Sequence, residues 1–361
     1  MKNIIVLVFL SFITLGFYGC PSNEDSAIVS PPPVDSCNNA NDNLYFASRF
    51  PIGTAVNYDA WKSDPEYAQL LSKHFNSLTA ENIMKPAYLH PDENIFRWEQ
   101  ADELVEYCQK NSVRLHGHTL LWHNQLPSWM QFYQGDEAAW DAMMKRHIQT
   151  IVRHFKGKVA AWDIVNEAFE EDGSFRRSVW YVQLGESYIE KAIQYAKEAD
   201  PNVLLFYNDY NLEFNALKRS AVLAHFGKLR AKGINIDGIG VQMHIYHVYP
   251  SPLMIRECLN EIAKENYKIH VSEMDVSVNP LSVDIDYNDS VQTVQMQQYE
   301  TVINAYKQIP ASLQYGCTFW GITDKYTWIR SSFLREDYPL LFDDNYKKKK
   351  LFNAVKFSLC K

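Results

Sequence analysis

A regular alternation of short apolar, β-rich runs with longer segments of helical periodicity constrains the fold of this chain most strongly. From about residue 41 onward, β-rich runs are predicted at 51–56, 76–81, 113–120, 159–165, 203–208, 236–243, 267–272 and 315–321. Helical periodicity occupies intervals between them, as in 138–155, 187–199, 216–232 and 294–308. Strands and helices that alternate at this spacing form a parallel sheet with crossover helices. Eight such units predict an α/β fold, a single (β/α)₈ TIM barrel.

The same pattern argues against other ways of folding a chain of this length. No glycine-rich phosphate-binding fingerprint follows a predicted strand, which disfavours a doubly wound nucleotide-binding sheet. The 361 residues are 47% hydrophobic, which is ample for one barrel of about 250 residues or more. No interval between strands is long enough for an inserted domain. We therefore predict one (β/α)₈ domain over residues 41–361.

The first residues read as a targeting segment rather than as part of the barrel. Residues 1–20 predict a lipoprotein-type signal peptide, with Lys2 as the positive start and an apolar stretch over 4–17. A small residue directly before Cys20 resembles a lipobox, in which the cysteine is lipidated. Tyr18 departs from the usual pattern, and an ordinary secretory signal is the alternative. We expect an exported protein, an outer-membrane or cell-surface lipoprotein of a bacterium, that meets the membrane only through lipid at Cys20.

Residues 21–40 and the remaining cysteines complete this picture. The segment 21–40 is rich in Pro, Ser, Asn and Asp and predicts a flexible linker. Cys37 precedes the predicted barrel and Cys360 almost ends the chain, so an exported protein could join them in a disulfide. The other cysteines lie in apolar periodic segments and are expected to be buried free thiols; they are Cys108, Cys258 and Cys317.

Charge and spacing exclude several classes of ligand. The net charge is −8, from 35 basic and 43 acidic residues, and the basic residues form no stripe beyond the run 347–350. Nucleic-acid binding is therefore not expected. No Cys or His spacing typical of a metal site is present, so neither a metal nor another cofactor is predicted. We expect a monomer.

Polar and aromatic side chains follow nearly every predicted strand. In a TIM barrel the active site lies at the carboxyl ends of the strands, so these side chains are expected on one rim. Any one of them could be a structural polar group, but their concentration on one rim favours a catalytic site. The residues are Glu81, Asn82, His118, Trp122, His123, Asn166, Glu167, Asn208, Asp209, Gln242, His244, Glu273, Asp275 and Trp320.

Two glutamates on this rim suggest the reaction. Glu167 ends the fourth predicted strand and Glu273 the seventh, so they would face each other across the barrel mouth. Glycoside hydrolysis requires two carboxylates, one that protonates the leaving oxygen and one that acts at the anomeric carbon or on water. A separation of about 5–5.5 Å would imply retention of configuration, and about 6.5–9.5 Å would imply inversion. Either glutamate alone could instead be a buried ion-pair partner.

Longer motifs carry a family resemblance that extends from about residue 45 to 355. With these segments the chain resembles the family 10 glycoside hydrolases, the endo-β-1,4-xylanases. The motifs run in the family's order and occupy residues 81–85, 117–123, 162–167, 208–211, 242–244, 272–275, 320–324 and 339–343.

The resemblance implies catalytic roles. Glu167 would be the acid/base and Glu273 the nucleophile of a retaining double displacement. Asn166 would bind the 2-hydroxyl of the sugar at the cleavage point. His244 would hold the carboxylate of Glu273 and keep it ionised, with Gln242 beside it.

It also implies a substrate and the residues that bind it. The substrates would be xylan and xylo-oligosaccharides, cut at internal bonds during plant cell-wall polysaccharide degradation. The implied binding residues are Lys85, His118 and Trp122 for the reactive sugar, Glu81 and Asn82 for the next sugar outward, and Trp320 and Trp328 for the roof of the cleft.

Two alternatives remain open on the sequence. A retaining glycosidase on the same barrel could act on cellulose or mannan, although the residues implied to bind the reactive sugar favour xylan. A lipoprotein that only binds glycans is the second alternative. The intact pair of Glu167 and Glu273 argues against it, because a pure binder needs neither an acid nor a nucleophile.

Overall fold

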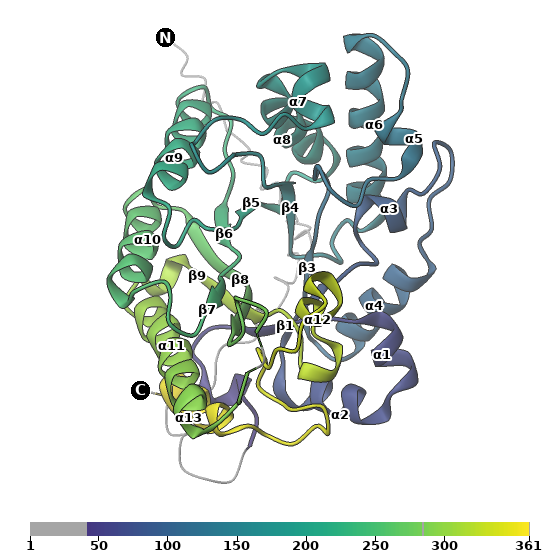
Figure 1. Ribbon diagram of the computed structural model, residues 1–361. Helices are drawn as coiled ribbons and strands as arrows, with labels where there is room; N and C mark the ends of the chain where they lie inside the picture. Colours follow the sequence, from purple (N-terminus) through teal and green to yellow (C-terminus); the bar gives the residue numbers. More distant parts are fainter. Residues whose placement is uncertain (1–41, 284, 361) are drawn as a thin grey trace, which may run out of the picture. The chain divides into compact units, whose positions relative to one another are not determined.

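The structure, a computed structural model, describes residues 42–283 and 285–360 and contains a closed parallel barrel (Figure 1). The strands lie in the order β6-β5-β4-β3-β2-β1-β9-β8, and pairing of β6 with β8 closes the ring. The predicted TIM barrel is therefore confirmed. The barrel strands are β1 (Ile52–Val56), β2 (Ser77–Ala80), β3 (Arg114–Gly117), β4 (Ala161–Asn166), β5 (Leu204–Asp209), β6 (Gly238–Val241), β8 (Lys268–Ser277) and β9 (Gln314–Phe319).

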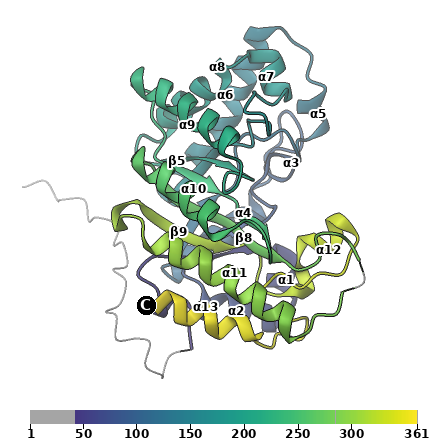
Figure 2. The same ribbon diagram turned by 60° about the vertical axis from the view of Figure 1, so that its left-hand side comes forward.

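Helices surround the ring, and Figure 2 shows α11 with α13 beside it on the outside. The helices are α1 (Tyr58–Ser63), α2 (Pro65–His74), α3 (Pro86–Leu89), α4 (Glu99–Lys110), α5 (Ser128–Gln131), α6 (Glu137–His154), α7 (Val179–Leu184), α8 (Ser187–Ala199), α9 (Ala216–Ala231), α10 (Pro252–Lys264), α11 (Asp289–Lys307), α12 (Trp328–Phe333) and α13 (Lys350–Cys360). Short 3₁₀ turns occupy Tyr45–Ala47, Ala311–Leu313 and Asp324–Tyr326.

Local sequence sets the starts of several helices that follow the rim. The side chain of Asn57 accepts a hydrogen bond from the backbone N–H of Ala60 and caps α1. Asn215 caps α9 in the same way, and Ser251 caps α10, whose first residue is proline. Such caps satisfy backbone donors that the helix leaves unpaired, and proline is well tolerated at the first helical position. The loops between strand ends and helices are therefore fixed at their far ends.

The sixth predicted strand differs from the observed one. The run 236–243 was expected to be a single strand, but β6 ends at Val241 and a short strand, β7 (His244–Tyr246), follows. Met243 lies between them with a φ of +62°, in the left-handed region, and this breaks the strand ladder. β7 then pairs in parallel with β8, which extends to Ser277 rather than ending at 272. This pairing sets His244 opposite Asp275.

The remaining predictions about the chain divide into two groups. Cys108, Cys258 and Cys317 are buried free thiols, as expected. The predicted signal peptide 1–20 with Cys20, the linker 21–40 and Cys37 lie outside the described residues. Cys360 is disulfide-bonded, and its pairing with Cys37 stays a prediction. Within the described part of the chain, no helix is both long and apolar enough to cross a membrane.

Candidate active site

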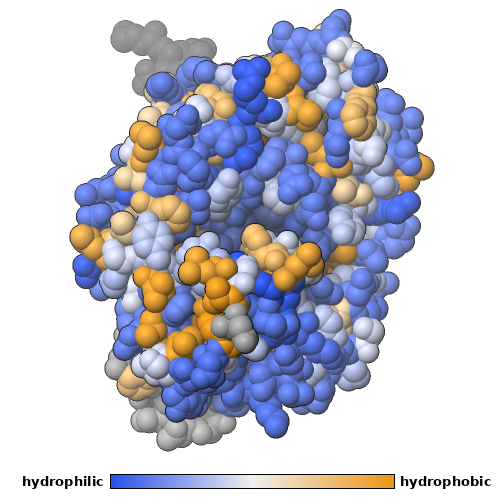
Figure 3. Space-filling model, viewed as in Figure 1, coloured by the Kyte–Doolittle hydropathy of each residue, from blue (hydrophilic) through white to orange (hydrophobic). Residues whose placement is uncertain are grey.

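A cavity of about 660 Å³ opens at the carboxyl ends of the barrel strands. The face seen in Figure 3 is hollowed near its middle; hydrophilic side chains lie in and above the hollow, and hydrophobic ones border its lower edge. The structure brings all the predicted catalytic and sugar-binding residues together around this cavity, which we call the cleft. Its lining comprises Glu81, Asn82, Lys85, Tyr88, His118, Trp122, Asn124, Gln125, Asn166, Glu167, Tyr210, Asn211, Gln242, His244, Tyr246, Glu273, Trp320, Trp328, Ser331 and Ser332.

Glu167 follows β4 directly, and its backbone is held in an unusual conformation. Its φ is +56°, which a residue with a side chain adopts only when the surroundings enforce it. The backbone N–H of Glu167 donates to the carbonyl of Asn208 at 2.9 Å, and Arg176 Nε donates to the Glu167 carbonyl at 2.9 Å. These two bonds fix the peptide units on both sides of the residue, and so aim the side chain into the cleft.

Neutral donors orient the carboxylate of Glu167. Trp122 Nε1 donates to Oε2 at 2.8 Å, while Gln242 Nε2 and Asn166 Nδ2 donate to Oε1 at 2.9 and 3.1 Å. The family resemblance predicts Gln242 beside His244, at Glu273. The backbone carbonyl of Gln242 accepts a hydrogen bond from the Glu273 N–H at 3.0 Å, while its side-chain amide is directed to Glu167. Carboxamide and indole donors hold the acid without bringing a positive charge into direct contact with it.

Glu273, on β8, lies in more strongly charged surroundings. Its Oε1 accepts a hydrogen bond from Asn208 Nδ2 at 2.6 Å, and its Oε2 lies 3.1 Å from His244 Nε2. Burial by itself would raise the pKa of Glu273. The hydrogen bond from His244, the fields of His118 and His244, and the Asn208 bond outweigh burial and hold this pKa below its usual range. Glu273 is therefore an ionised carboxylate, only 4% exposed.

His244 supplies the positive charge beside Glu273. Burial alone would lower the pKa of His244, but Asp275 and Glu273 raise it to about 10. The Nδ1 atom of His244 lies 3.0 Å from Asp275 Oδ2, and this oxygen also accepts a hydrogen bond from Trp328 Nε1 at 2.8 Å. His244 is thus an imidazolium held between two carboxylates. The expected link between His244 and Glu273 is present in the structure.

Asn208 connects the two glutamates, a contact that sequence reasoning missed. Its Nδ2 donates to Glu273 Oε1 at 2.6 Å and to Asn166 Oδ1 at 2.9 Å, while its Oδ1 accepts from Ser272 Oγ at 2.6 Å. A Cβ at Gly240 would lie 2.2 Å from Asn208 Oδ1, so this neighbour must lack a side chain. The available signal was a pair of polar residues, Asn-Asp, at the end of the fifth strand.

Lys85 lines the cleft close enough to three glutamates for their charges to act on it. Its Nζ donates to Asn82 Oδ1 at 3.1 Å and lies 5.1 Å from the centre of the Trp122 ring. Burial lowers the pKa of Lys85, whereas the charges of Glu273, Glu81 and Glu167 act in the opposite direction. A buried ammonium at this position offers hydrogen bonds to hydroxyl groups of a ligand.

A buried aspartate on β4 fixes the ring of His118. Asp163 Oδ2 lies 2.8 Å from His118 Nδ1, and its other oxygen lies 3.0 Å from His116 Nε2. Burial would raise the pKa of Asp163, but the two histidines lower it well below the usual range. With Nδ1 engaged, His118 has Nε2 available for the cleft. Trp320 stands nearby, its ring centre 5.4 Å from that of His118.

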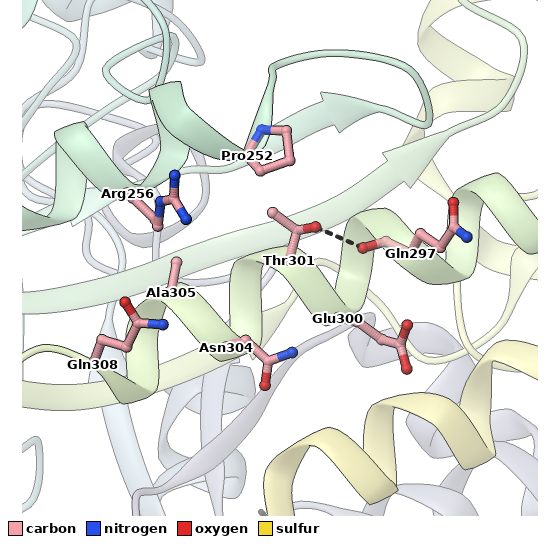
Figure 4. Close-up of a pocket in the computed structure, with 8 residues that line it drawn as sticks. All are labelled: Pro252, Arg256, Gln297, Glu300, Thr301, Asn304, Ala305 and Gln308. Carbon is pink, nitrogen blue, oxygen red and sulfur yellow. Dashed lines mark hydrogen bonds between the residues drawn. The ribbon is translucent and has the colours of Figure 1, made fainter.

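A second cavity, between α10 and α11, has a different chemistry (Figure 4). It measures about 330 Å³ and contains one carboxylate, that of Glu300. Its lining comprises Pro252, Arg256, Gln297, Glu300, Thr301, Asn304, Ala305 and Gln308. It therefore lacks the pair of carboxylates that the predicted glycoside hydrolysis would require, whereas the cleft contains such a pair. Among residues 42–283 and 285–360, no group of three or more His, Cys, Asp or Glu side chains is arranged to hold a metal ion.

Comparison with known proteins decides the family. The family described as glycosyl hydrolase family 10 matches residues 41–357. The chain belongs to this family. It is therefore a glycoside hydrolase, and glycosyl hydrolase family 10 retains anomeric configuration.

Individual relatives agree with this assignment. A β-1,4-xylanase of Dictyoglomus thermophilum is 41% identical over 319 residues, which cover 85% of this chain and 88% of that protein. Endo-1,4-β-xylanase A of Thermoanaerobacterium saccharolyticum is 38% identical over 86% of this chain, which spans only 27% of that longer protein. The crystal structure of xylanase 10B from Thermotoga petrophila with xylobiose has a TM-score of 0.83 and 37% identity. The match covers 89% of this chain and 97% of the Thermotoga petrophila chain.

The charge on His244 predicts how activity depends on pH. Glu273 must be ionised to react, so activity is lost as the pH falls through its pKa. Replacing His244 by glutamine removes the positive charge and raises this pKa, because the carboxylate loses its stabilising partner. The acidic limb of kcat/KM should therefore move to higher pH in H244Q.

A surface histidine provides the control for this experiment. His154 Nε2 lies 2.7 Å from Asp102 Oδ1 outside the cleft, so H154Q removes a histidine–carboxylate pair of similar geometry. Its pH profile should match that of the unaltered enzyme. An acidic limb that H244Q leaves in place would contradict the role given to His244.

A buried ion pair between Lys218 and Asp209 predicts an effect on the free energy of unfolding. Lys218 Nζ lies 2.9 Å from Asp209 Oδ1, and both side chains are fully buried. Burial raises the pKa of Asp209 to about 7, and Lys218 opposes this rise. Lys218→Met should lower the free energy of unfolding by about 3–5 kcal/mol, because it leaves a carboxylate buried without its partner.

The decrease in the free energy of unfolding caused by Lys218→Met should be smaller at pH 5 than at pH 8, because at pH 5 Asp209 can take up a proton and become neutral. Guanidinium unfolding at the two pH values measures this difference. Lys232, whose Nζ lies 2.8 Å from Glu190 Oε2 on the surface, gives the matched control K232M, with an expected cost of about 0–1 kcal/mol. Equal losses in the two variants would refute the prediction.

Proposed function

We propose that this chain is an endo-1,4-β-xylanase that hydrolyses internal β-1,4 bonds of xylan and xylo-oligosaccharides with retention by a two-glutamate double displacement. The observation that carries the proposal is the unequal environment of two carboxylates in one cleft. Neutral donors hold Glu167, whereas an imidazolium holds Glu273. A proton carrier and an ionised nucleophile require such a difference. The substrate class follows the xylanases to which the chain is similar.

In the first step, Glu167 would transfer its proton to the glycosidic oxygen as the bond from the anomeric carbon to that oxygen breaks. Glu273 Oε would form a covalent ester with the same carbon, and the shortened chain would leave as an alcohol. Esterification removes the negative charge of Glu273 from the cleft. Glu167, now a carboxylate, would take a proton from water, whose oxygen attacks the anomeric carbon and releases Glu273.

Asn166 and Asn208 would support the same step. The Nδ2 of Asn166 lies 3.1 Å from Glu167 Oε1, and its Oδ1 accepts from Asn208 Nδ2 at 2.9 Å. This pair of amides sets the position of Asn166 between the two glutamates, where a sugar 2-hydroxyl would be bound. Hydrogen bonds that strengthen as charge develops accelerate the reaction more than bonds of constant strength.

The test is a comparison of substrates with the full enzyme. We expect reducing sugar to be released from linear xylan much faster than from carboxymethylcellulose or mannan. Proton NMR should show the β-anomer as the first product. If reducing sugar were released faster from carboxymethylcellulose or mannan than from xylan, that polysaccharide would be the substrate instead. If the protein bound these glycans but hydrolysed none of them over days, it would be a glycan-binding protein and the proposed activity would be wrong.

We further propose that the enzyme degrades plant cell-wall polysaccharide as an exported, monomeric lipoprotein held to the outer membrane or cell surface by lipid at Cys20. The sequence of residues 1–20 supports the anchor, and the predicted linker 21–40 would separate the barrel from the membrane. Metabolic labelling with an alkyne fatty acid should mark the full chain, and Cys20→Ala should lose the label. Equal labelling of both would refute the anchor.

A further inference from the structure

The loop after β4 folds back on itself and returns Arg176 to the side of Glu167. Phe169 and Phe175 form an antiparallel bridge across this loop. Gly173 lies in the turn between them with a φ of +79°, a conformation that glycine adopts at no steric cost. The turn thus places an arginine, distant from any regular strand or helix, next to the glutamate that ends β4.

Side chains hold both polar atoms of the peptide unit that joins Glu167 to Ala168. Arg176 Nε donates to the carbonyl of Glu167 at 2.9 Å, and the N–H of Ala168 donates to the hydroxyl of Tyr207 at 3.0 Å. The φ of Glu167, +56°, takes this unit out of the strand ladder, where backbone groups would find each other as partners. Because the Cα of Glu167 is one end of this unit, a change in its orientation would turn the carboxylate away from its place in the cleft.

The same guanidinium also reaches the wall of the cleft. Arg176 Nη2 donates to the hydroxyl of Tyr210 at 2.7 Å, and Tyr210 lines the cleft. The side chain of Arg176 is only 16% exposed, and Glu170 Oε2 lies 3.4 Å from its Nη2. Burial alone would lower the pKa of Arg176, but its hydroxyl and carboxylate neighbours raise it. The planar fork of a guanidinium can serve two acceptors in a fixed geometry, which a single ammonium cannot.

We propose that Arg176 is a positioning residue for proton transfer by Glu167, whose backbone its guanidinium joins to Tyr210 in the cleft wall. This inference rests on the proposed function. Arg176 is not among the residues that line the cleft, so it acts through Glu167 and not on the sugar. Its loss should therefore slow the steps in which Glu167 transfers a proton, and leave a step that needs no proton unchanged.

The test compares R176A with the unaltered enzyme on two substrates. On linear xylan, kcat of R176A should fall on the order of 10²-fold with little change in KM, because a misplacement of about 1 Å can have an effect of this size. On dinitrophenyl β-xylobioside, kcat/KM reports the first step and should stay nearly unchanged, since dinitrophenolate departs without a proton. Thermal unfolding checks that the variant is folded.

Two forms of rescue separate this role from a purely structural one. Guanidinium chloride, at a concentration that leaves the unaltered enzyme folded and active, should restore part of the xylan activity of R176A, because the free ion can donate to both acceptors. R176K keeps the charge but can serve only one acceptor at a time. It should show a smaller loss than R176A with the same dependence on the leaving group, and it provides the test if R176A does not fold.

The matched control is R230A. Arg230 Nη1 donates to the carbonyl of Glu265 at 2.8 Å, and its guanidinium carbon lies 4.0 Å from the centre of the Tyr267 ring. These are the same kinds of contact, but Tyr267 directly precedes β8 and so lies at the end of the barrel opposite the cleft. R230A should match the unaltered enzyme on both substrates, and guanidinium should not change its rates.

Three results would overturn the inference. They are an unchanged xylan rate in R176A, equal losses on the two substrates, and a failure of both guanidinium and R176K to recover activity on xylan. The proposed function is tested separately by the unaltered enzyme. If that enzyme did not hydrolyse linear xylan, the proposed function would be wrong, whatever the variants showed.

Discussion

Glu273→Ala should lower kcat for xylan hydrolysis by roughly 10⁵-fold, since loss of a covalent nucleophile typically removes most of an enzyme's rate enhancement. Glu273 accepts hydrogen bonds from Asn208 and His244, which position its carboxylate in the cleft. Alanine leaves a small space beside a positive imidazolium. Initial rates on linear xylan, with circular dichroism to check folding, measure the effect.

Azide should partly restore the activity of Glu273→Ala. A small anion can enter the space left by the carboxylate, where His244 attracts it, and attack the anomeric carbon of an activated aryl xylobioside. Because no second displacement follows, the product would be the α-xylobiosyl azide, of opposite configuration to the substrate. A β-configured azide product, or near-full activity without azide, would exclude Glu273 as the nucleophile.

Glu300→Ala is the control for this variant. Glu300 lines the cavity between α10 and α11, so its removal deletes a carboxylate without touching the cleft. Its activity on xylan should stay within about twofold of the unaltered enzyme, because surface substitutions away from special features have small effects. Azide should not change its product.

The barrel was predictable because strand and helix periodicities are properties of local sequence. A β-rich run and the helical segment after it identify a βα unit without knowledge of its neighbours. The break between β6 and β7 was not predictable in this way. It depends on the left-handed conformation of Met243, and a methionine gives no signal for a positive φ.

The members of the site were predictable, but their contacts with one another were not. Strand ends identify the rim, so Gln242 and Asn208 were both noticed. Which glutamate each amide serves depends on side-chain directions across the barrel, and these are set by packing such as that of Asn208 on Gly240. Asp209 illustrates the same limit. Successive side chains of a strand point to opposite faces, so Asn208 faces the cleft while Asp209 pairs with Lys218 outside it.

Glu167→Ala should slow xylan hydrolysis by about 10²–10⁴-fold, the usual contribution of a positioned general acid or base. The loss should depend on the leaving group. A xylose hydroxyl is a poor leaving group and needs the proton of Glu167, whereas dinitrophenolate departs without one. With dinitrophenyl β-xylobioside, the first step should therefore stay fast while hydrolysis of the ester at Glu273 becomes slow. Stopped-flow absorbance should show a burst of phenolate of about one equivalent per enzyme.

Glu170→Ala is the matched control for this variant. Glu170 lies three residues beyond Glu167, and its Oε2 pairs with Arg176 at 3.4 Å outside the cleft lining. Its rate on xylan should be nearly unchanged and should show no burst on the aryl substrate. If Glu167→Ala instead lost activity equally on xylan and on the dinitrophenyl substrate, with no burst, Glu167 would not be the proton donor. The different donors around the two glutamates would then serve only to hold their carboxylates in place. If the burst is observed, one experiment distinguishes the two roles. The burst reports formation of the ester at Glu273, and the slow phase after it reports hydrolysis of that ester without the base Glu167.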